Sequence, residues 1–148
     1  MQQYYYNQLS KPEKSVYDAM LPAFAAFAPA ARVLRLENAR VSDIFCRLRL
    51  DHPELFYLKD YSLRYYPEAD YAELRPVYLF DKGRLREHRQ ALAARAARLL
   101  RPVQNASDEE KLLFIHHFIC TGVRYDKLKK EYSHEILGPL VLGVSVCE

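Results

Sequence analysis

The stretch from Phe56 to Phe80 decides the fold: FYLKDYSLRYY at residues 56–66, PEAD at residues 67–70 and ELRPVYLF at residues 73–80. The two outer segments are rich in aromatic and other strand-forming residues and alternate in part, as strands do. The segment between them contains proline and aspartate, which favour a turn. We therefore expect an antiparallel hairpin. Pro76 predicts an edge position or a bulge in the second strand, because proline donates no hydrogen bond to a ladder.

Helical patterns precede the hairpin. Ser10 and Glu13 have the spacing of a capping box. The apolar positions of the helix that follows are Val16, Met20, Phe24 and Phe27. Residues 33–36 alternate weakly, which indicates a short strand. Ser42 caps a predicted short helix that ends before Pro53, because a residue before proline avoids the helical region.

Two more helices are predicted after the hairpin. An Ala-, Arg- and Leu-rich run beginning at Asp81 or Lys82 ends before Pro102. Ser107 and Glu110 have the spacing of a second capping box, which opens a helix reaching about Gly122. Helices placed around a hairpin predict an α+β fold.

The composition fits a soluble globular protein. The 148 residues suffice for one domain, and 50% hydrophobic with 28% charged residues excludes a disordered chain. A net charge of +3 is too small to indicate nucleic acid binding, so the arginines between residues 84 and 101 are interpreted as the solvated face of a helix.

The longest apolar run, residues 21–31, is short and broken by Pro22 and Pro29. We therefore expect no membrane span. The polar and aromatic start of the sequence is not a signal peptide. A signal removed from the sequence would leave the same pattern, so the compartment stays open, cytoplasmic or extracytoplasmic.

The three cysteines, Cys46, Cys120 and Cys147, are an odd number at wide spacing. This pattern excludes a disulfide framework and offers no paired metal-ligand spacing, so neither a metal nor a cofactor is predicted. Cys46 and Cys120 fall on apolar helical positions and are expected to be buried and inert.

The histidines are interpreted as structural. His116 and His117 lie mid-helix, where we expect one to pack and the other to be exposed. His88 is expected at the surface. His52 lies in the run DHPELF at residues 51–56, which is interpreted as a local turn with backbone donors satisfied by Asp51 and Glu54.

Cys147 is the candidate nucleophile. It follows the small apolar run LVLGVSV at residues 140–146, in which Gly143 permits a tight turn. A thiol at a loop-to-helix junction gains from the positive helix N-terminus, which favours the thiolate and lowers the pKa. Backbone amides at such a junction can also hold an oxyanion.

Two motifs resemble bacterial transglutaminase-like domains. Tyr125-Asp126, a polar loop, and then GVSVCE at residues 143–148 resemble the lead-in to the catalytic cysteine of that family. The run DHPELF at residues 51–56, followed by Tyr57, resembles a helix–strand signature that precedes the core in many of these proteins. The N-terminal Tyr4–Tyr6 and Leu9-Ser10 resemble the start of the same architecture, so the likeness runs along essentially the whole chain.

The resemblance implies that this is the N-terminal part of a transglutaminase-like cysteine enzyme. Residues 1–104 are then a helical and hairpin region, and residues 105–148 begin a truncated papain/transglutaminase-like core, the two packed as one unit. It implies a nucleophile, Cys147, paired with a His and an Asp or Asn that come later in the chain, and a peptide or protein substrate. Because that base and the Gly-Tyr-Ala continuation of the motif are missing, we expect the fragment itself to be inactive.

Several alternatives stay open. The parent protein hydrolyses an amide, as a peptidase or amidase, or transfers the acyl group to an amine, as a transglutaminase. A non-catalytic protein-binding module of the same fold is the second hypothesis, and an unrelated α+β domain with an incidental terminal cysteine is the third. Since Leu140, Leu142 and Val146 lack their expected cover, we expect this end to be disordered, to pair with the missing half, or to associate with another chain.

Overall fold

The computed structural model describes residues 3–146. Within them, helix makes up 58% and strand 17%, with four main helices and a three-stranded antiparallel sheet, which confirms the α+β class. The chain divides into two compact units, Met1–Leu79 (unit 1) and Phe80–Glu148 (unit 2). The division at residues 104/105 that the family resemblance implies stays a prediction.

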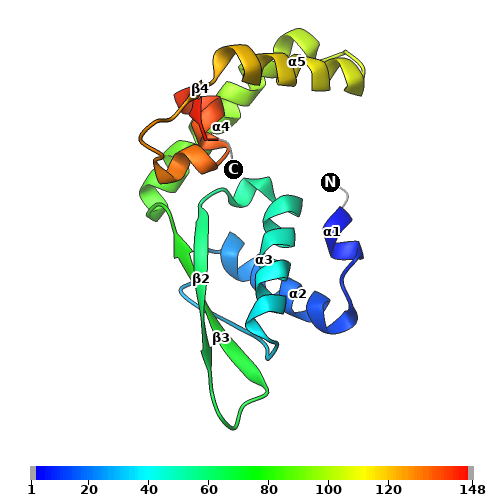
Figure 1. Ribbon diagram of the computed structural model, residues 1–148, viewed down its shortest axis with the longest axis vertical. Coiled ribbons are helices and arrows are strands. Elements are labelled where there is room, and N and C mark those ends of the chain that lie inside the picture. Colours follow the sequence, from blue (N-terminus) through cyan, green and yellow to red (C-terminus); the bar gives the residue numbers. More distant parts are fainter. Residues whose placement is uncertain (1–2, 147–148) are drawn as a thin grey trace. The chain divides into compact units, whose positions relative to one another are not determined.

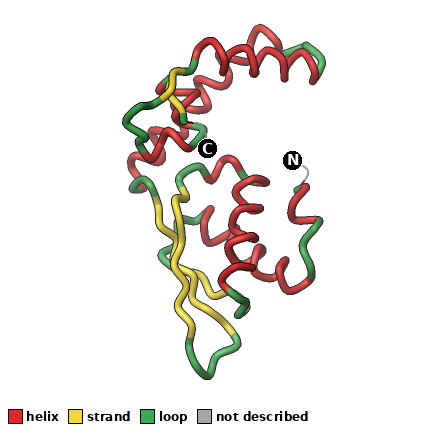
Figure 2. The backbone as a smooth tube through the Cα atoms, in the orientation of Figure 1, coloured by secondary structure: helices red, strands yellow, loops and turns green. Residues whose placement is uncertain are grey.

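The sheet of unit 1 contains the predicted hairpin. It is formed by β1 (Ala31–Leu34), β2 (Leu58–Tyr65) and β3 (Tyr71–Tyr78), in the order β1-β3-β2 with antiparallel pairing. Figure 2 shows β2 and β3 joined by a loop at one end.

Pro76 lies in β3, which is the central strand of the sheet and not one of its two edge strands. It is tolerated because the pairing of β1 with β3 ends at Ala31 opposite Leu74, so Pro76 pairs only with Tyr61 of β2. The irregularity in the ladder lies in β2, between Leu58 and Asp60.

Three α-helices belong to unit 1: α1 (Tyr4–Asn7), α2 (Lys11–Ala25) and α3 (Asn38–Asp51). The capping box before α2 is present, with the Ser10 N–H donating to Glu13 Oε2 over 2.8 Å. The prediction that Ser42 caps α3 was wrong: the helix begins earlier and its N-cap is Glu37. Figure 1 shows α2 and α3 on the same side of the sheet.

The core of unit 1 lies between these helices and the sheet. The ring centroids of Phe24 and Phe45 are 5.9 Å apart, and Phe27 stacks on Tyr78 at 3.8 Å. The buried Tyr57 hydroxyl donates to the Phe24 carbonyl over 3.0 Å. The largest fully buried side chains of this core are Tyr17, Met20, Phe24, Ile44, Leu48, Tyr57, Leu58 and Leu74.

Unit 2 is helical with one short strand pair. Its elements are α4 (Lys82–Leu100), a 3-10 turn η2 (Arg101–Val103), α5 (Asp108–Gly122), β4 (Arg124–Tyr125), a 3-10 turn η3 (Glu131–His134), a π-helical turn η4 (Gly138–Leu142) and β5 (Val144–Ser145). Both predicted helices, α4 and α5, are therefore confirmed. Across residues 3–146, no helix has the length and apolarity needed to cross a membrane.

Candidate functional site

The DHPELF motif contains the predicted local turn, η1 (Pro53–Leu55), and its first residue, Asp51, also binds groups far along the chain. We name Asp51 and its three donors, Tyr5, Tyr6 and Tyr17, the Asp51 clasp. The Asp51 carboxylate accepts from the N–H groups of Tyr5 and Tyr6, over 3.0 and 2.9 Å, and from the buried Tyr17 hydroxyl over 3.1 Å. These bonds join α1 and α2 to the last residue of α3. Burial, and next the negative charge of Asp51, raise the pKa of the Tyr17 hydroxyl well above its ordinary value.

His52 belongs to the same structural motif. Its Nδ1 lies 2.7 Å from Glu54 Oε1, and its ring centroid lies 6.1 Å from that of Tyr17. Its Nε2 is buried without a hydrogen-bond partner in the described part of the chain. Its interactions are with α2 and η1 (Pro53–Leu55), so His52 lies in the fold of unit 1 and not in the region before Cys147.

Helix α5 precedes the segment that leads to Cys147. Its capping box is present, with the Ser107 N–H donating to Glu110 Oε2 over 2.8 Å, and these bonds lower the pKa of Glu110. His116 and His117 are both exposed, so the expectation that one of them packs was wrong.

Cys46 and Cys120 are also exposed, contrary to the sequence-based expectation. Cys46 follows the buried Phe45 on α3, but its own side chain is exposed. No residue of α5 is buried, although the helix has apolar positions, so Cys120 is exposed as well. Its Sγ lies 3.8 Å from His116 Nε2.

The strands β4 and β5 pair in parallel, with Arg124 opposite Val144 and Tyr125 opposite Ser145. The Arg124 N–H donates to the Gly143 carbonyl over 2.9 Å, and the Asp126 N–H donates to the Ser145 carbonyl over 2.8 Å. The sequence named Tyr125-Asp126 and GVSVCE as one motif, and the structure brings their described residues together.

Asp126 is the centre of a hydrogen-bond network that the sequence did not reveal. Its carboxylate accepts from the N–H groups of Leu128 and Lys130, over 3.0 and 3.1 Å, and from the hydroxyl of the fully buried Ser133. The Ser133 hydroxyl, and then these two N–H groups, hold the pKa of Asp126 below its ordinary value.

The same network holds the chain as far as Val146. The Ser133 carbonyl accepts from the Ser145 hydroxyl over 3.2 Å and from the Val146 N–H over 3.3 Å. The residue before the candidate nucleophile is thereby fixed to η3, which Asp126 fixes in turn. We name these residues, Asp126, Ser133, Ser145 and Val146, the lead-in network.

Two glycines permit this arrangement. A Cβ on Gly138 would lie 2.6 Å from the Val144 carbonyl oxygen and 2.9 Å from Ser133 Cα, so only glycine lets η3 and β5 approach η4 this closely. Gly143 has a φ of 67°, the left-handed conformation that glycine adopts without strain, and it ends the π-helical turn. The sequence predicted the tight turn at Gly143 but not the close approach at Gly138.

Arg95 connects the helices of unit 2 to this turn. Its Nε donates to the Leu140 carbonyl over 3.1 Å, and its guanidinium carbon lies 5.6 Å from the Phe118 ring centroid. A single side chain of α4 therefore contacts both α5 and η4, and it stabilises the turn from which β5 begins.

Cys147, the candidate nucleophile, and Glu148 lie outside the described residues. Among residues 3–146 no group of three or more His, Cys, Asp or Glu side chains could hold a metal ion.

No protein-family model matches the chain, and no curated protein matches it either.

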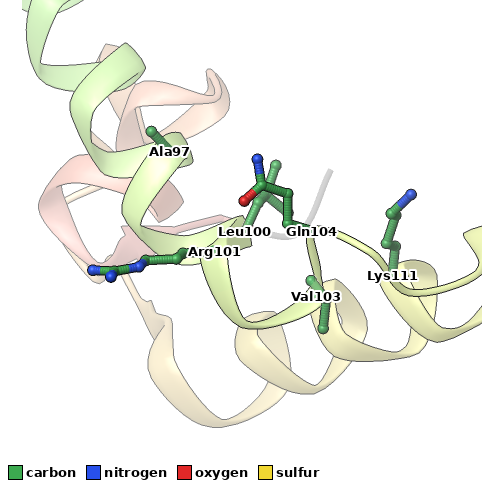
Figure 3. A pocket seen from close by; sticks show the side chains of 6 residues that line it. All are labelled: Ala97, Leu100, Arg101, Val103, Gln104 and Lys111. Carbon is green, nitrogen blue, oxygen red and sulfur yellow. The ribbon is translucent and has the colours of Figure 1, made fainter.

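A hollow of about 500 Å³ lies where α4 passes through η2 toward α5 (Figure 3). Its lining combines apolar Ala97, Leu100 and Val103 with polar Arg101, Gln104 and Lys111. Figure 3 shows the Arg101 side chain pointing away from Gln104 and Lys111, so the two cations do not converge on one ligand.

The lead-in network is expected to loosen in acid. Because the pKa of Asp126 is lower when folded than when unfolded, its carboxylate stabilises the fold above the unfolded pKa, about 3.9, and that contribution is lost as the pH falls through the folded pKa. NMR amide shifts of Leu128 and Lys130 should therefore be constant from neutral pH to about 5 and titrate below it. Asp126→Asn removes the titration; shifts that titrate alike in this variant would contradict the assignment.

Proposed function

We propose that residues 105–148 are the first part of a papain/transglutaminase-like core and that Cys147 is its nucleophile. The observation that carries the proposal is the lead-in network, because it fixes the backbone as far as Val146, next to the candidate cysteine. A nucleophile has to be held in one position relative to its substrate, and hydrogen bonds that fix the residue before it contribute to that condition.

The chemistry would be acyl transfer. The Cys147 thiolate attacks the carbonyl carbon of an amide, the C–N bond breaks, and the amine leaves with a proton supplied by a general acid. The resulting thioester is resolved by water in a peptidase or amidase, or by a second amine in a transglutaminase.

The general base is expected from polypeptide that follows Cys147. Of the five histidines, His116, His117 and His134 are exposed. His88 lies with its ring centroid 4.4 Å from that of Phe80, and His52 lies beside the Asp51 clasp of unit 1. By the resemblance, the base comes later in the chain than any of them. The 148-residue chain is therefore expected to be inactive alone, as the sequence resemblance implies.

Uncovered apolar surface in unit 2 supports the same proposal. Among the described residues, Leu85 and Leu137 are the buried hydrophobic side chains of this unit. Leu112 is 67% exposed and Leu142 46% exposed, while Leu140 and Val146 are half-buried. A unit with so few buried apolar side chains and large apolar side chains left exposed commonly packs against another surface, so we expect further polypeptide to cover them.

An activity-probe experiment tests the function. A polypeptide extended by the next hundred or so codons of the gene is treated with an amide-mimicking electrophile, and the labelled residue is mapped by mass spectrometry. We expect label on Cys147 and none in the Cys147→Ala variant. Label confined to Cys46 and Cys120 would leave the non-catalytic binding module as the better description.

A further inference from the structure

A basic loop follows β4 in unit 2. Its four residues, Lys127, Leu128, Lys129 and Lys130, are all exposed, and Leu128 is 74% exposed. The loop contains three cations and no acid. Of its flanking acids, Asp126 is buried with three hydrogen-bond donors, whereas Glu131 is exposed.

Hydrogen bonds to Asp126 fix the backbone conformation of the basic loop. The Asp126 carboxylate binds the N–H groups of Leu128 and Lys130, and the Lys129 N–H donates to the Asp126 carbonyl over 3.1 Å. Lys129 has a φ of 46°, a left-handed conformation that residues other than glycine rarely adopt. The fold thus maintains a strained backbone that presents an apolar side chain among lysines.

The position of the loop relates it to the candidate nucleophile. β4 and β5 are parallel, so their carboxyl ends lie at the same edge of the pair. The basic loop leaves β4 at this edge, and β5 leads through Val146 to Cys147 from the same edge. The basic loop therefore lies at the edge where β5 ends, two residues before Cys147 in the chain.

We propose that the basic loop binds an acidic peptide segment that carries an apolar side chain, and so selects acidic substrates. The inference rests on the proposed function for its location. Three lysines complement several carboxylates, and Leu128 offers one apolar contact beside them. A membrane surface is the less suitable partner, because stable anchoring takes a larger apolar insertion or a second signal.

The test measures binding to the Cys147→Ala chain, so that no thiol chemistry contributes. The probe is a peptide with four glutamates, one leucine and one glutamine, labelled with an uncharged dye and followed by fluorescence anisotropy. We expect saturable binding that weakens with salt, and a loss of about tenfold in the variant with Lys127, Lys129 and Lys130 all changed to Gln. Leu128→Ser is expected to weaken binding by about tenfold as well.

The matched control removes the same number of cations from the arginine-rich segment of unit 2, residues 84–101. In this control Arg86, Arg98 and Arg101 are all changed to Gln. We expect affinity within about twofold of the parent chain, because screening confines charge effects to near neighbours. Equal losses in the two triple variants, equal binding of a lysine-for-glutamate peptide, or binding only to phosphatidylserine vesicles would each overturn the proposal. None of these outcomes depends on Cys147, so they are separable from failure of the activity-probe test.

Discussion

Replacing Asp51 by alanine is expected to release α1 and to lower the free energy of unfolding of unit 1 by about 3 kcal/mol. The variant leaves the N–H groups of Tyr5 and Tyr6 and the buried hydroxyl of Tyr17 without their shared acceptor. Each such loss costs about 1–3 kcal/mol when the donor stays buried, and water can reach the two partly buried N–H groups. Hydrogen–deuterium exchange of the full chain, followed on peptides from residues 1–79, measures the change.

Two control variants make the Asp51 experiment specific. Asp43→Ala removes an exposed carboxylate from the same helix, where it pairs with Arg47 over 2.8 Å, and is expected to cost no more than about 0.5 kcal/mol. Asp51→Asn keeps one acceptor oxygen, so its loss of free energy of unfolding is expected to lie between the losses of Asp43→Ala and Asp51→Ala. If Asp43→Ala and Asp51→Ala have the same effect, the clasp does not organise unit 1.

Replacing Gly138 by alanine is expected to disrupt the lead-in network and to destabilise unit 2 by about 3 kcal/mol. The added methyl group would lie 2.6 Å from the Val144 carbonyl oxygen and 2.9 Å from Ser133 Cα. Both contacts are with backbone, so β5 or η3 has to move and no side chain can rotate away. The measurement is loss of amide protection at Asp126 and Val146, which depend on the β4–β5 pairing and on Ser133.

Alanine substitutions at Gly143 and Gly83 distinguish the effect of a steric contact from that of backbone strain. Gly143→Ala has room for a methyl group, with the nearest atom at 3.8 Å, and pays only for a φ of 67°, about 1 kcal/mol. Gly83→Ala raises the helix propensity of the first turn of α4, but its Cβ would lie 3.2 Å from Oδ1 of the N-cap Asp81, so we expect the two effects to offset and stability to change by less than about 1 kcal/mol. A Gly138→Ala variant that behaves like Gly143→Ala would show that η4 does not pack closely on β5.

The sequence was sufficient for the elements whose signals are local. Both capping boxes, at Ser10 and Ser107, open helices as predicted, because the cap and its partner lie three residues apart. The hairpin followed from strand-forming residues on either side of a turn. The tolerance of Pro76 is different, because it depends on where β1 stops pairing with β3, which is an interaction between distant parts of the chain.

Interactions between residues far apart in the chain could not be predicted. Asp51 binds backbone groups 45 and 46 residues away, and no residue pattern reveals a backbone partner at such a distance along the chain. The role of Ser133 in η3 depends on Asp126, seven residues earlier, and on Ser145 in β5. Cys120 was expected to be buried because its position is apolar, but periodicity shows which face is apolar and not what covers it.

The central claim is that Cys147 is an activated nucleophile in the completed domain. The most direct test measures the rate of iodoacetamide alkylation of each cysteine against pH, in the 148-residue chain and in the extended polypeptide. We expect the thiolate pKa of Cys147 to fall well below the ordinary value of about 8.5 in the extended polypeptide and to fall less in the short chain. Equal thiolate pKa values for Cys147 in the two polypeptides would contradict the account.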